Sequence, residues 1–470
     1  MQLRAGPVAE RPRTGMNGVK VVVVGPISIA WDNPARMKYG GVERVAWRLT
    51  HLLSAVGYDV VPVAPSDSRF SQSVSRRRLW PGSSLHQPNR RPRVFAEDVS
   101  LIIDDYARHV RDVLISERPR VIILLGPAPQ ILETIERHIS TVIERLIVAL
   151  HNGPSDNLQT IPILKRLHGA RLVALSNAQR LAFGELSKRI EVVLDGIPVE
   201  AVPFSSQPDE VRGQIAARDD ALGRSIIDPK RPIISQVDYF HPSKGMLLSL
   251  ELFRASGLYL SHDLLLAGGM GWQLPERGAS GRPRLGAQYL DRIHTYVKQH
   301  SLQGSVRILG DLTGAQTVNL LMASDIGLSP ARMAHGALWP DDQAASDPES
   351  YGQGRATGNA AGIPVLMSEK YDSSFAPADM PFLRFGSISA GIQCLKKVAT
   401  DYVDANARKH FRSFAMQRDS IRPGFVRYLE LIAEICDRTE GVLLRPPAGS
   451  VVDLAVQKLV TMEAEALVVA

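Results

Sequence analysis

Two patterns of apolar residues alternate along the chain, and each predicts one kind of secondary structure. Residues 19–24 are all valine apart from Lys20, which is typical of a short strand buried in a parallel sheet. After a loop, residues 40–57 carry apolar side chains at helical spacing, and Gly57 ends the predicted helix. A second apolar run at residues 59–64 completes a strand–helix–strand unit. This order predicts a parallel sheet with right-handed crossovers.

The alternation continues along the first part of the chain and predicts a first doubly wound domain over residues 19–204. Helical stretches separate the further predicted strands, which lie at residues 121–125, 146–150, 172–175 and 192–194. Residues 1–18 contain several arginines and prolines but no apolar core of signal-peptide length. We predict that they form a disordered N-terminal segment.

A polar stretch separates this domain from a second set of the same elements. Residues 205–230 are charged and helix-prone and are predicted to form a linker. The pattern then restarts, with helices predicted at 245–256 and 287–300 and strands at 232–237, 263–267, 306–309, 326–328 and 364–367. We therefore expect a second α/β domain over residues 231–437. A tail over residues 438–470 ends in an amphipathic segment.

Length and composition agree with two domains in a reducing compartment. A chain of 470 residues exceeds the size at which a single core stops growing, which is about 250–300 residues. Its two cysteines, Cys394 and Cys436, provide no disulfide framework. The sequence has no uninterrupted apolar run of about 18 residues, so it predicts no membrane-spanning helix. We predict a cytoplasmic protein.

One region is strongly basic within a chain of net charge +7. Six arginines fall between Arg76 and Arg93, and the prolines, glycine and serines among them indicate a loop. The simplest interpretation is a solvated loop. The alternative is a peripheral contact with anionic lipid headgroups at the inner face of the membrane, or with an anionic acceptor, in which Leu79 and Trp80 enter the interface. No recognition motif accompanies the arginines, so nucleic acid is not a predicted partner.

Several enzyme classes lack their sequence signature in this chain. No G-x-G-x-x-G follows the early strands, as a dinucleotide-binding dehydrogenase needs, and no G-x-S-x-G nucleophile elbow is present. The stretch from His241 to Lys244 resembles a P-loop only superficially. The paired acids are Asp104 with Asp105, Asp219 with Asp220, and Asp341 with Asp342. We place each pair on a helix face, in the linker or in a loop, and predict no metal requirement.

The segment DPESYGQGRATGNAAGIPV, at residues 347–365, carries the strongest chemical signal. It places Glu349 ahead of three closely spaced glycines. Glycines let the backbone approach a ligand and present bare amides, which suits a phosphate or sugar hydroxyls. An apolar run at residues 325–330 predicts a strand before this segment, and open α/β sheets bind ligands beyond the carboxyl ends of their strands. We predict a ligand site here.

Seven blocks of sequence, taken in order, resemble the retaining GT-B glycosyltransferases of family 4. They are MKYGGVERVAWRLTHLLSAVGYDV, VALHNG, RLVALSNAQR, VVLDGIPVEAVPF, PIISQVDYFHPSKG, VRILGDLTGAQTVNLLMASDIGLSP and ESYGQGRATGNAAGIPV. The resemblance extends from residue 20 to residue 428. It implies a GT-B fold, in which two Rossmann-like doubly wound domains face each other across a cleft. Members of the family bind a nucleotide-diphosphate sugar in that cleft, mostly against the second domain, and the first domain is then the acceptor domain.

The resemblance also implies roles for particular residues. Lys244 balances the charge of the leaving diphosphate, Glu349 binds sugar hydroxyls, and His151 lies beside the transferred sugar. The amides of Gly40 and Gly41 lie near the diphosphate or the acceptor, as expected at a helix N-terminus. The further implied donor-binding positions are Gly310, Asp311, Leu312, Ser350, Gly352, Gln353 and Thr357.

The implied activity is transfer of a hexose from a nucleotide-diphosphate sugar to a glycan, a lipid-linked acceptor or a small molecule, as in polysaccharide biosynthesis. The nucleotide sugar is a substrate, and neither a cofactor nor a metal is implied. Cleavage of the glycosyl–phosphate bond builds negative charge on the diphosphate, and one fixed donor aimed at such charge typically contributes about 3–4 kcal/mol. In the retaining mechanism of this family, the leaving phosphate helps to deprotonate the acceptor on the same face.

Two positions depart from the family pattern. Tyr239 stands where the family has an arginine five residues before the lysine. Thr357 stands where the family has a second glutamate that holds the ribose hydroxyls, and the neighbouring Arg355 could compensate. These departures favour an alternative, a catalytically silent homologue that binds nucleotide sugars or acts as a scaffold. A membrane-surface adaptor that acts through the arginine-rich loop is a third interpretation.

Each candidate residue also has a purely structural explanation. Lys244 could be a surface lysine before a helix, Glu349 a first-turn acid that supports the helix dipole, and His151 a turn residue. Glu43 is interpreted as a dipole-favourable acid of the first helix. Asp195, which precedes a glycine, is interpreted as a turn residue where the family commonly has Asn-Gly.

Overall fold

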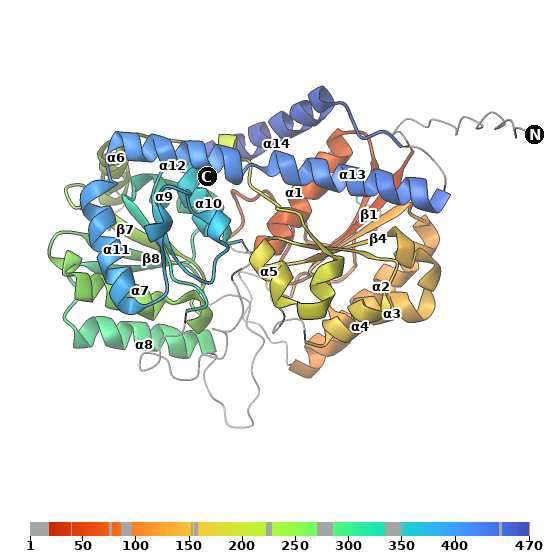
Figure 1. Ribbon diagram of the computed structural model, residues 1–470, viewed down its shortest axis with the longest axis horizontal. Coiled ribbons are helices and arrows are strands. Elements are labelled where there is room, and N and C mark those ends of the chain that lie inside the picture. Colours follow the sequence, from red (N-terminus) through yellow and green to blue (C-terminus); the bar gives the residue numbers. More distant parts are fainter. Residues whose placement is uncertain are drawn as a thin grey trace, which may run out of the picture.

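The computed structural model consists of two lobes that lie side by side, each built around one six-stranded sheet (Figure 1). All pairings between the described strands are parallel, which confirms the two tandem α/β domains predicted from the sequence. Residues 1–17, predicted to be disordered, lie outside the described ranges. The structure describes residues 18–38, 40–74, 78–85, 96–151, 154, 158–221, 228–269, 285–333, 349, 351–440 and 444–469.

The first sheet has the strand order β2-β1-β3-β4-β5-β6. Val21 and Val23 of β1 face one core, whereas Val22 and Val24 face another, because side chains alternate along a strand. Helices cover both faces, so the valine run is buried throughout. The strands are β1 (Lys20–Val24), β2 (Asp59–Val63), β3 (Val121–Leu125), β4 (Leu146–Leu150), β5 (Arg171–Ala174) and β6 (Ile190–Val192).

The helices of the first lobe follow the predicted pattern. Ala46, Leu49 and Leu53 of α1 recur at helical spacing and are buried in the same core as β1. The α-helices are α1 (Gly41–Ala55), α2 (Ala96–Glu117), α3 (Pro129–His138), α4 (Thr160–Arg166) and α5 (Asn177–Ala182). Short 3-10 helices are η1 (Ser140–Arg145), η3 (Gly184–Arg189) and η4 (Val199–Ala201).

The second sheet has the strand order β12-β11-β10-β7-β8-β9. Its strands are β7 (Ile233–Val237), β8 (Asp263–Ala267), β9 (Val306–Gly310), β10 (Ile326–Ser329), β11 (Val365–Ser368) and β12 (Arg384–Phe385). Its α-helices are α6 (Pro208–Ala221), α7 (Met246–Ser256), α8 (Leu285–Gln299), α9 (Gly314–Ala323), α10 (Gln353–Ala360), α11 (Ile388–Asp401) and α12 (Ala405–Arg418). Short 3-10 helices are η5 (Pro242–Lys244), η6 (Leu258–Leu260), η9 (Ser373–Phe375) and η10 (Pro381–Leu383).

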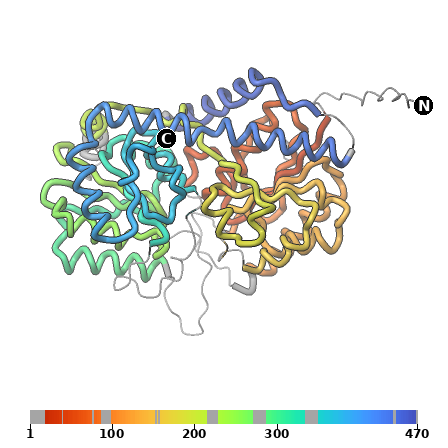
Figure 2. Tube along the Cα trace, in the orientation of Figure 1, coloured from red at the N-terminus to blue at the C-terminus, as the bar shows by residue number. Residues whose placement is uncertain are grey.

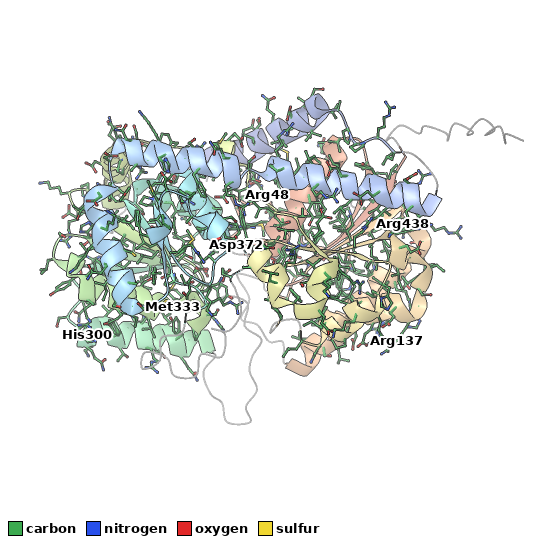
Figure 3. All side chains as sticks on the ribbon, in the orientation of Figure 1. Arg48, Arg137, His300, Met333, Asp372 and Arg438 are labelled. Carbon is green, nitrogen blue, oxygen red and sulfur yellow. The ribbon has the colours of Figure 1, made fainter. Side chains whose placement is uncertain are left out.

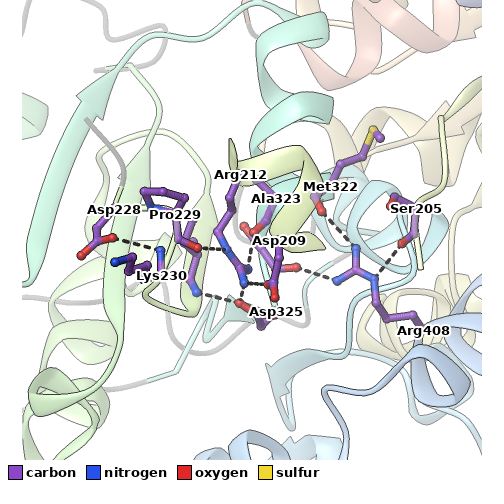
Figure 4. A network of polar contacts seen from close by, with 12 residues as sticks. Ser205, Asp209, Arg212, Asp228, Pro229, Lys230, Met322, Ala323, Asp325 and Arg408 are labelled. Carbon is purple, nitrogen blue, oxygen red and sulfur yellow. Dashed lines mark hydrogen bonds and ion pairs between the residues drawn. The ribbon is translucent and has the colours of Figure 1, made fainter. Parts of the chain in front are cut away.

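The segment at residues 205–230, predicted as a linker, contains helix α6, which packs against α9 of the second lobe. Arg212 of α6 is buried and pairs with Asp325 at the start of β10 (Nη1 to Oδ2, 2.8 Å; Figure 4). Arg408 of α12 donates to backbone carbonyls beside this pair (Figure 4). This charged segment therefore docks as a helix in which the buried cation of Arg212 meets a carboxylate.

After α12 the chain crosses back to the first lobe, as the blue end of the trace shows (Figure 2). Helices α13 (Ile421–Glu440) and α14 (Gly449–Val469) bury Phe425 and Leu459 in the core that contains β1. The sequence analysis assigned residues up to 437 to the second domain, whereas α13 covers the first sheet. Helical periodicity identifies an apolar face but not the sheet that this face will cover.

The tryptophan of the basic region is a core residue. Trp80 is 5% exposed, packs edge-to-face against Tyr106, and donates from Nε1 to Asp105 (3.0 Å). The predicted insertion of Trp80 into a membrane interface is therefore wrong. Residues 75–77 and 86–95 lie outside the described ranges, so a lipid contact through the arginines stays a prediction. Within the described part of the chain, no helix combines the length and apolar character needed to cross a membrane.

Candidate functional site

Loops that follow the carboxyl ends of the two sheets meet between the lobes. Gln353 Nε2 of α10 donates to the carbonyl of Gly41 in α1 (3.0 Å), and the Ala178 amide of α5 donates to the Asp372 carboxylate (2.9 Å). Figure 3 labels Asp372 at this boundary. Open α/β sheets bind ligands at this edge. The predicted site residues fall into clusters on the two sides of the boundary.

In the second lobe, Lys244 and Glu349 form a buried ion pair. Lys244 Nζ lies 3.1 Å from Glu349 Oε1 and 3.0 Å from Oε2. Lys244 ends the 3-10 helix before α7, and the Glu349 amide donates to the Lys370 carbonyl beyond β11 (3.0 Å). Lys244 is thus not a surface lysine, and Glu349 precedes α10 rather than lying in its first turn. The two residues that the resemblance assigned to one site do lie together.

Burial and neighbouring charges act on this cluster in opposite directions. Burial alone lowers the pKa of Lys244, but the carboxylates of Glu349 and Asp238 outweigh it and hold that pKa well above its usual value. Asp238 Oδ1 lies 3.7 Å from Lys244 Nζ. Burial raises the pKa of Asp238 to about 6, with Glu349 adding to the rise and Lys244 opposing it. Lys244 is therefore a fixed cation at neutral pH.

The sequence analysis missed a second cation in this cluster. Arg332, in the loop after β10, places Nε 3.8 Å from Glu349 Oε2, and its amide donates to the Ser243 carbonyl (2.6 Å). Its φ of 60° lies in the left-handed region, which non-glycine residues adopt rarely and only where their surroundings impose it. The sequence offered one clue to this role. Arg332 follows a predicted strand, and the carboxyl ends of such strands form the edge where open α/β sheets bind ligands.

Tyr239, which replaces the arginine expected from the resemblance, lies beside the same lysine. Lys244 Nζ is 5.5 Å from the centroid of the Tyr239 ring, and the tyrosine is 37% exposed. An aromatic face therefore stands next to the cation and remains accessible. The second positive charge comes from Arg332, on a different loop.

Two helix N-termini approach each other at the boundary between the lobes. Helix α10 is capped by Gly352, whose φ of 71° suits glycine, and a Cβ there would lie 2.7 Å from the Tyr371 hydroxyl. Helix α1 is capped by Gly40, with a φ of 100°. The Gln353 side chain joins the two ends through the Gly41 carbonyl. Helix N-termini present unpaired amides and partial positive charge, so this arrangement suits an anion.

Two further residues of α10 use their polar groups within the protein. Thr357 Oγ1 donates to the carbonyl of Gln353 one turn earlier (2.8 Å). Arg355 is 2% exposed and binds both carboxylate oxygens of Asp419 (3.0 and 2.8 Å). The idea that Arg355 compensates for a missing site charge is therefore wrong, because its charge is already neutralised. A donor contact by Thr357 stays a prediction, and Ser350 lies outside the described residues.

In the first lobe, His151 follows β4 and pairs with Asp195. His151 Nε2 lies 2.8 Å from Asp195 Oδ2, and both side chains are buried. His151 Nδ1 lies 3.3 Å from the Ala149 carbonyl. Asp195, interpreted from sequence as a turn residue, therefore fixes the histidine ring. The predicted contact of His151 with a sugar stays a prediction.

Glu43 of α1 is the unexpected member of this first cluster. The sequence predicted an acid supported by the helix dipole, but Glu43 is only 4% exposed. Burial raises its pKa to about 7, against smaller opposing effects that include a hydrogen bond from Ser28 and the charge of nearby His151. Its Oε2 would lie 2.9 Å from a Cβ on Gly40, so the glycine cap also makes room for this carboxylate. Nothing in the sequence distinguishes a buried acid in the first turn of a helix from an exposed one.

The predicted nucleobase segment lies at the end of β9, an edge strand. The Gly310 carbonyl accepts from the Gly268 amide (2.7 Å), and the Asp311 carboxylate lies against Gly269. Leu312 is partly buried in a small core beneath the second sheet. Among the described residues, no hydrogen bond or ion pair joins this segment to the Lys244 cluster, so its role stays a prediction.

The described residues contain no group of three or more histidine, cysteine or acidic side chains arranged to hold a metal ion. Asp104 and Asp105 lie on α2, and Asp219 and Asp220 lie on α6, as the sequence analysis placed them. Asp341 and Asp342 lie outside the described ranges. The absence of a metal requirement stays a prediction.

The sequence matches no protein-family model and no curated protein. Solved structures match over most of the chain, however. Sucrose-phosphate synthase from Thermosynechococcus elongatus matches with a TM-score of 0.64 and 13% identity, covering 89% of this chain and 99% of that one. WaaG, a glycosyltransferase involved in lipopolysaccharide biosynthesis, matches with a TM-score of 0.56 and 13% identity over 89% of this chain and 100% of WaaG.

A third match is HepE of Anabaena in complex with UDP and glucose, with a TM-score of 0.56 and 13% identity over 88% of this chain and 100% of HepE. All three matches extend over both lobes and almost the whole of the other chain. The chain has the GT-B fold of these glycosyltransferases.

Proposed function

We propose that the protein is a retaining hexosyltransferase that moves a hexose from a nucleotide-diphosphate sugar to a glycan, lipid-linked or small-molecule acceptor in the cytoplasm. The observation that carries this proposal is the meeting of two glycine-capped helix N-termini, joined by the Gln353–Gly41 hydrogen bond. Buried Lys244 and partly buried Arg332 lie in loops that follow strands of the second sheet. The GT-B fold supports the same class of reaction.

The main requirement of this reaction is that the site stabilise the negative charge on the leaving group. Cleavage of the glycosyl–phosphate bond leaves negative charge on the diphosphate, and amides of α1 and α10 together with Lys244 and Arg332 would stabilise it. Such fixed donors work best when they need no reorganisation, and one is typically worth about 3–4 kcal/mol. The ion pairs with Glu349 hold both cations in place before the donor arrives.

Glu349 would orient the donor by accepting hydrogen bonds from sugar hydroxyls. Its two oxygens already bind Lys244, so a sugar hydroxyl would use the remaining lone pairs. His151, held by Asp195, would border the sugar from the first lobe. The leaving phosphate would deprotonate the acceptor on the same face, which retains the anomeric configuration and requires no separate protein base.

A specific observation favours one alternative function. Arg355 is neutralised by Asp419, and Thr357 bonds to its own helix, so neither replaces the family groups that the sequence lacks. A silent homologue would bind a nucleotide sugar without transferring it. Donor binding and turnover therefore have to be measured separately.

The first experiment is a thermal-shift screen of the full chain against UDP-, GDP-, ADP- and TDP-sugars. UDP-glucose leads the panel because HepE was crystallised with UDP and glucose. A ligand at about 100 times its Kd should stabilise the fold by about 2.7 kcal/mol. The ligand that shifts the melting temperature then enters a transfer assay, and retention is read from the anomeric configuration of the product.

The matched pair of variants is Lys244→Ala and Lys397→Ala. Lys397 is an exposed lysine on α11 that pairs with Asp401, far from the loops of the site. We expect Lys244→Ala to abolish the donor-induced shift and turnover, and Lys397→Ala to leave both unchanged. A shift without transfer in the native protein would favour the silent homologue, and no shift with any donor would contradict the proposal.

A further inference from the structure

The C-terminal helix α14 sends one carboxylate into the first lobe. Glu463 binds Arg48 of α1 through two hydrogen bonds, Nε to Oε1 at 2.7 Å and Nη2 to Oε2 at 2.9 Å. Both side chains are buried, with exposed fractions of 8% and 7%. Figure 3 labels Arg48 at the boundary between the lobes. A bidentate pair of this kind fixes the plane of the guanidinium group.

One nitrogen of Arg48 takes no part in this ion pair. Its Nη1 is buried and has no hydrogen-bond partner among the described residues. Asp195 Oδ1 and the Tyr428 hydroxyl are also buried without a hydrogen bond of normal geometry, although Asp195 lies close enough to add to the rise that burial causes in the pKa of Tyr428. All three residues line one small cavity of about 20 Å³. The rest of its wall is apolar and includes Leu49 of α1 and Phe425 of α13. The three residues that carry these polar atoms thus border one small cavity.

The size and chemistry of this cavity suit one water molecule. A cavity of about 10–15 Å³ or more can hold one water molecule, which then requires two to four polar partners. Arg48 can only donate, Asp195 can only accept, and the Tyr428 hydroxyl can do either. Leaving three such atoms unpaired would cost about 1–3 kcal/mol for each. A cation would be repelled by Arg48 and an anion by Asp195.

The other oxygen of Asp195 leads to the proposed site. Asp195 Oδ2 lies 2.8 Å from His151 Nε2, so one carboxylate contacts both the cavity and the histidine. We propose that a single buried water joins Arg48, Asp195 and Tyr428, and that Glu463 positions the His151 ring through Arg48, this water and Asp195. Glu463 and Arg48 are positioning residues, because neither touches a substrate.

The water site stands on the cavity alone, whereas its effect on turnover rests on the proposed function. Glu463→Gln tests the connection, because it keeps the shape of the side chain and removes its charge. Asp453→Asn is the matched control on the same helix. Asp453 pairs with exposed Arg422 and does not reach Arg48. Tyr428→Phe removes one partner of the water while keeping the aromatic ring in the core.

Two measurements on the full chain test the proposal without requiring activity. A crystal structure that resolves ordered water should contain one water within hydrogen-bond distance of Arg48 Nη1, Asp195 Oδ1 and the Tyr428 hydroxyl. Nitrogen NMR of labelled histidines should show that the His151 ring signals change in Glu463→Gln and Tyr428→Phe but not in Asp453→Asn. A dry cavity beside ordered interior waters elsewhere, or His151 signals that match the native ones in both variants, would overturn the proposal.

Kinetics separate this proposal from the proposed function. A lost water-mediated hydrogen bond corresponds to a rate change of about two- to tenfold. We expect Glu463→Gln to lower kcat by that factor with the KM of the donor unchanged, and Arg48→Lys to restore little of the NMR signature because lysine cannot form the bidentate pair. If the native protein transfers no sugar but the NMR changes appear, the proposed function fails and the water connection stands. Unchanged kcat in an active enzyme would overturn the positioning role.

Discussion

The two halves of the proposed site differ in where their residues come from. In the second lobe, Lys244, Arg332 and Glu349 all lie on loops that follow strands of a single sheet. In the first lobe, the His151–Asp195 pair is enclosed by Tyr428 of α13, a helix from the far end of the chain. We call this cluster of Lys244, Arg332 and Glu349 the donor half, and its three charged residues all belong to one domain. The other half depends on C-terminal helices that cross the boundary between the lobes.

The two halves also differ in the electrostatic surroundings of their buried glutamates. Glu349 is ion-paired with Lys244 and lies near Arg332, so its charge is compensated. Glu43 is buried with no arginine or lysine bonded to it among the described residues, and burial raises its pKa to about 7. Burial without a partner favours the neutral acid, whereas burial against a cation favours the carboxylate. A buried glutamate is therefore compensated by cations in the second lobe, whereas in the first lobe burial favours its neutral form.

The largest expected effect tests the dependence of the first lobe on α14. Leu459 is 2% exposed in the core that contains β1, whereas Leu454 of the same helix is 52% exposed. Leu459→Ala should destabilise the protein by about 2–5 kcal/mol through lost burial and a cavity. Leu454→Ala should change stability by less than about 0.5 kcal/mol. Equal melting temperatures for the two variants would contradict the packing of α14 on this core.

A second prediction contrasts the two buried acids through pH. The folded-state pKa of Glu43, about 7, lies above its ordinary value of 4.5, so ionisation destabilises the folded protein progressively as pH rises between these values. Glu43→Gln removes this penalty and should raise the melting temperature at pH 8 but not near pH 4.5. The full difference is on the order of 3 kcal/mol.

Glu349→Gln is the counterpart that sharpens this contrast. It leaves Lys244 and Arg332 without their shared carboxylate and should lower the melting temperature at pH 8. Melting curves of both variants from pH 5 to pH 8 check the prediction. If Glu43→Gln lowered stability at pH 8 as Glu349→Gln does, the distinction between the two halves would be wrong.

A third prediction concerns the cation that the sequence analysis missed. Arg332→Ala removes a charged hydrogen-bond donor from the donor half and should weaken nucleotide-sugar binding by about 1.5–3 kcal/mol. Arg307→Ala is the control, because Arg307 lies near the amino end of β9 and bonds to backbone carbonyls. Calorimetric titration measures both affinities. Equal donor affinities in the two variants would show that Arg332 does not contribute to donor binding.

The smallest expected effect concerns Thr357, which bonds to the carbonyl of Gln353 in its own helix. Thr357→Val keeps the shape of the side chain and should change donor affinity by less than about 0.5 kcal/mol, roughly twofold. The same titration detects a larger change. A substantial loss would show that the hydroxyl turns toward the donor, and would place Thr357 in the donor half.

Much of the fold could be predicted because its signals are local. The valine run of β1 and the helical spacing of α1 depend on neighbours a few residues away, and the structure places both where the sequence predicts them. Lys244 and Glu349 were assigned to one site by the family resemblance, and the structure brings their side chains together. Arg332 also follows a predicted strand, yet one arginine among many in a basic chain carries no mark of its own.

Other features depended on contacts between distant segments. Arg355 and Asp419 are far apart in sequence, and only their packing shows that each neutralises the other. Trp80, which one of two interpretations of the basic region placed at a membrane interface, packs against Tyr106 of α2. Whether a charged or aromatic side chain is exposed depends on which segment folds over it, and periodicity does not contain that information.

Local patterns in the sequence predict the two parallel sheets, the order of their strands along the chain and the loops at the carboxyl ends of those strands. Hydrophobic periodicity and strand ends are properties of short segments, so they can be followed residue by residue. The packing of α13 and α14 on the first lobe, the approach of Arg332 to the Lys244 cluster and the cavity between Arg48 and Asp195 emerge only in three dimensions. These features require burial and charge compensation between segments that are distant in the sequence, which no local pattern contains.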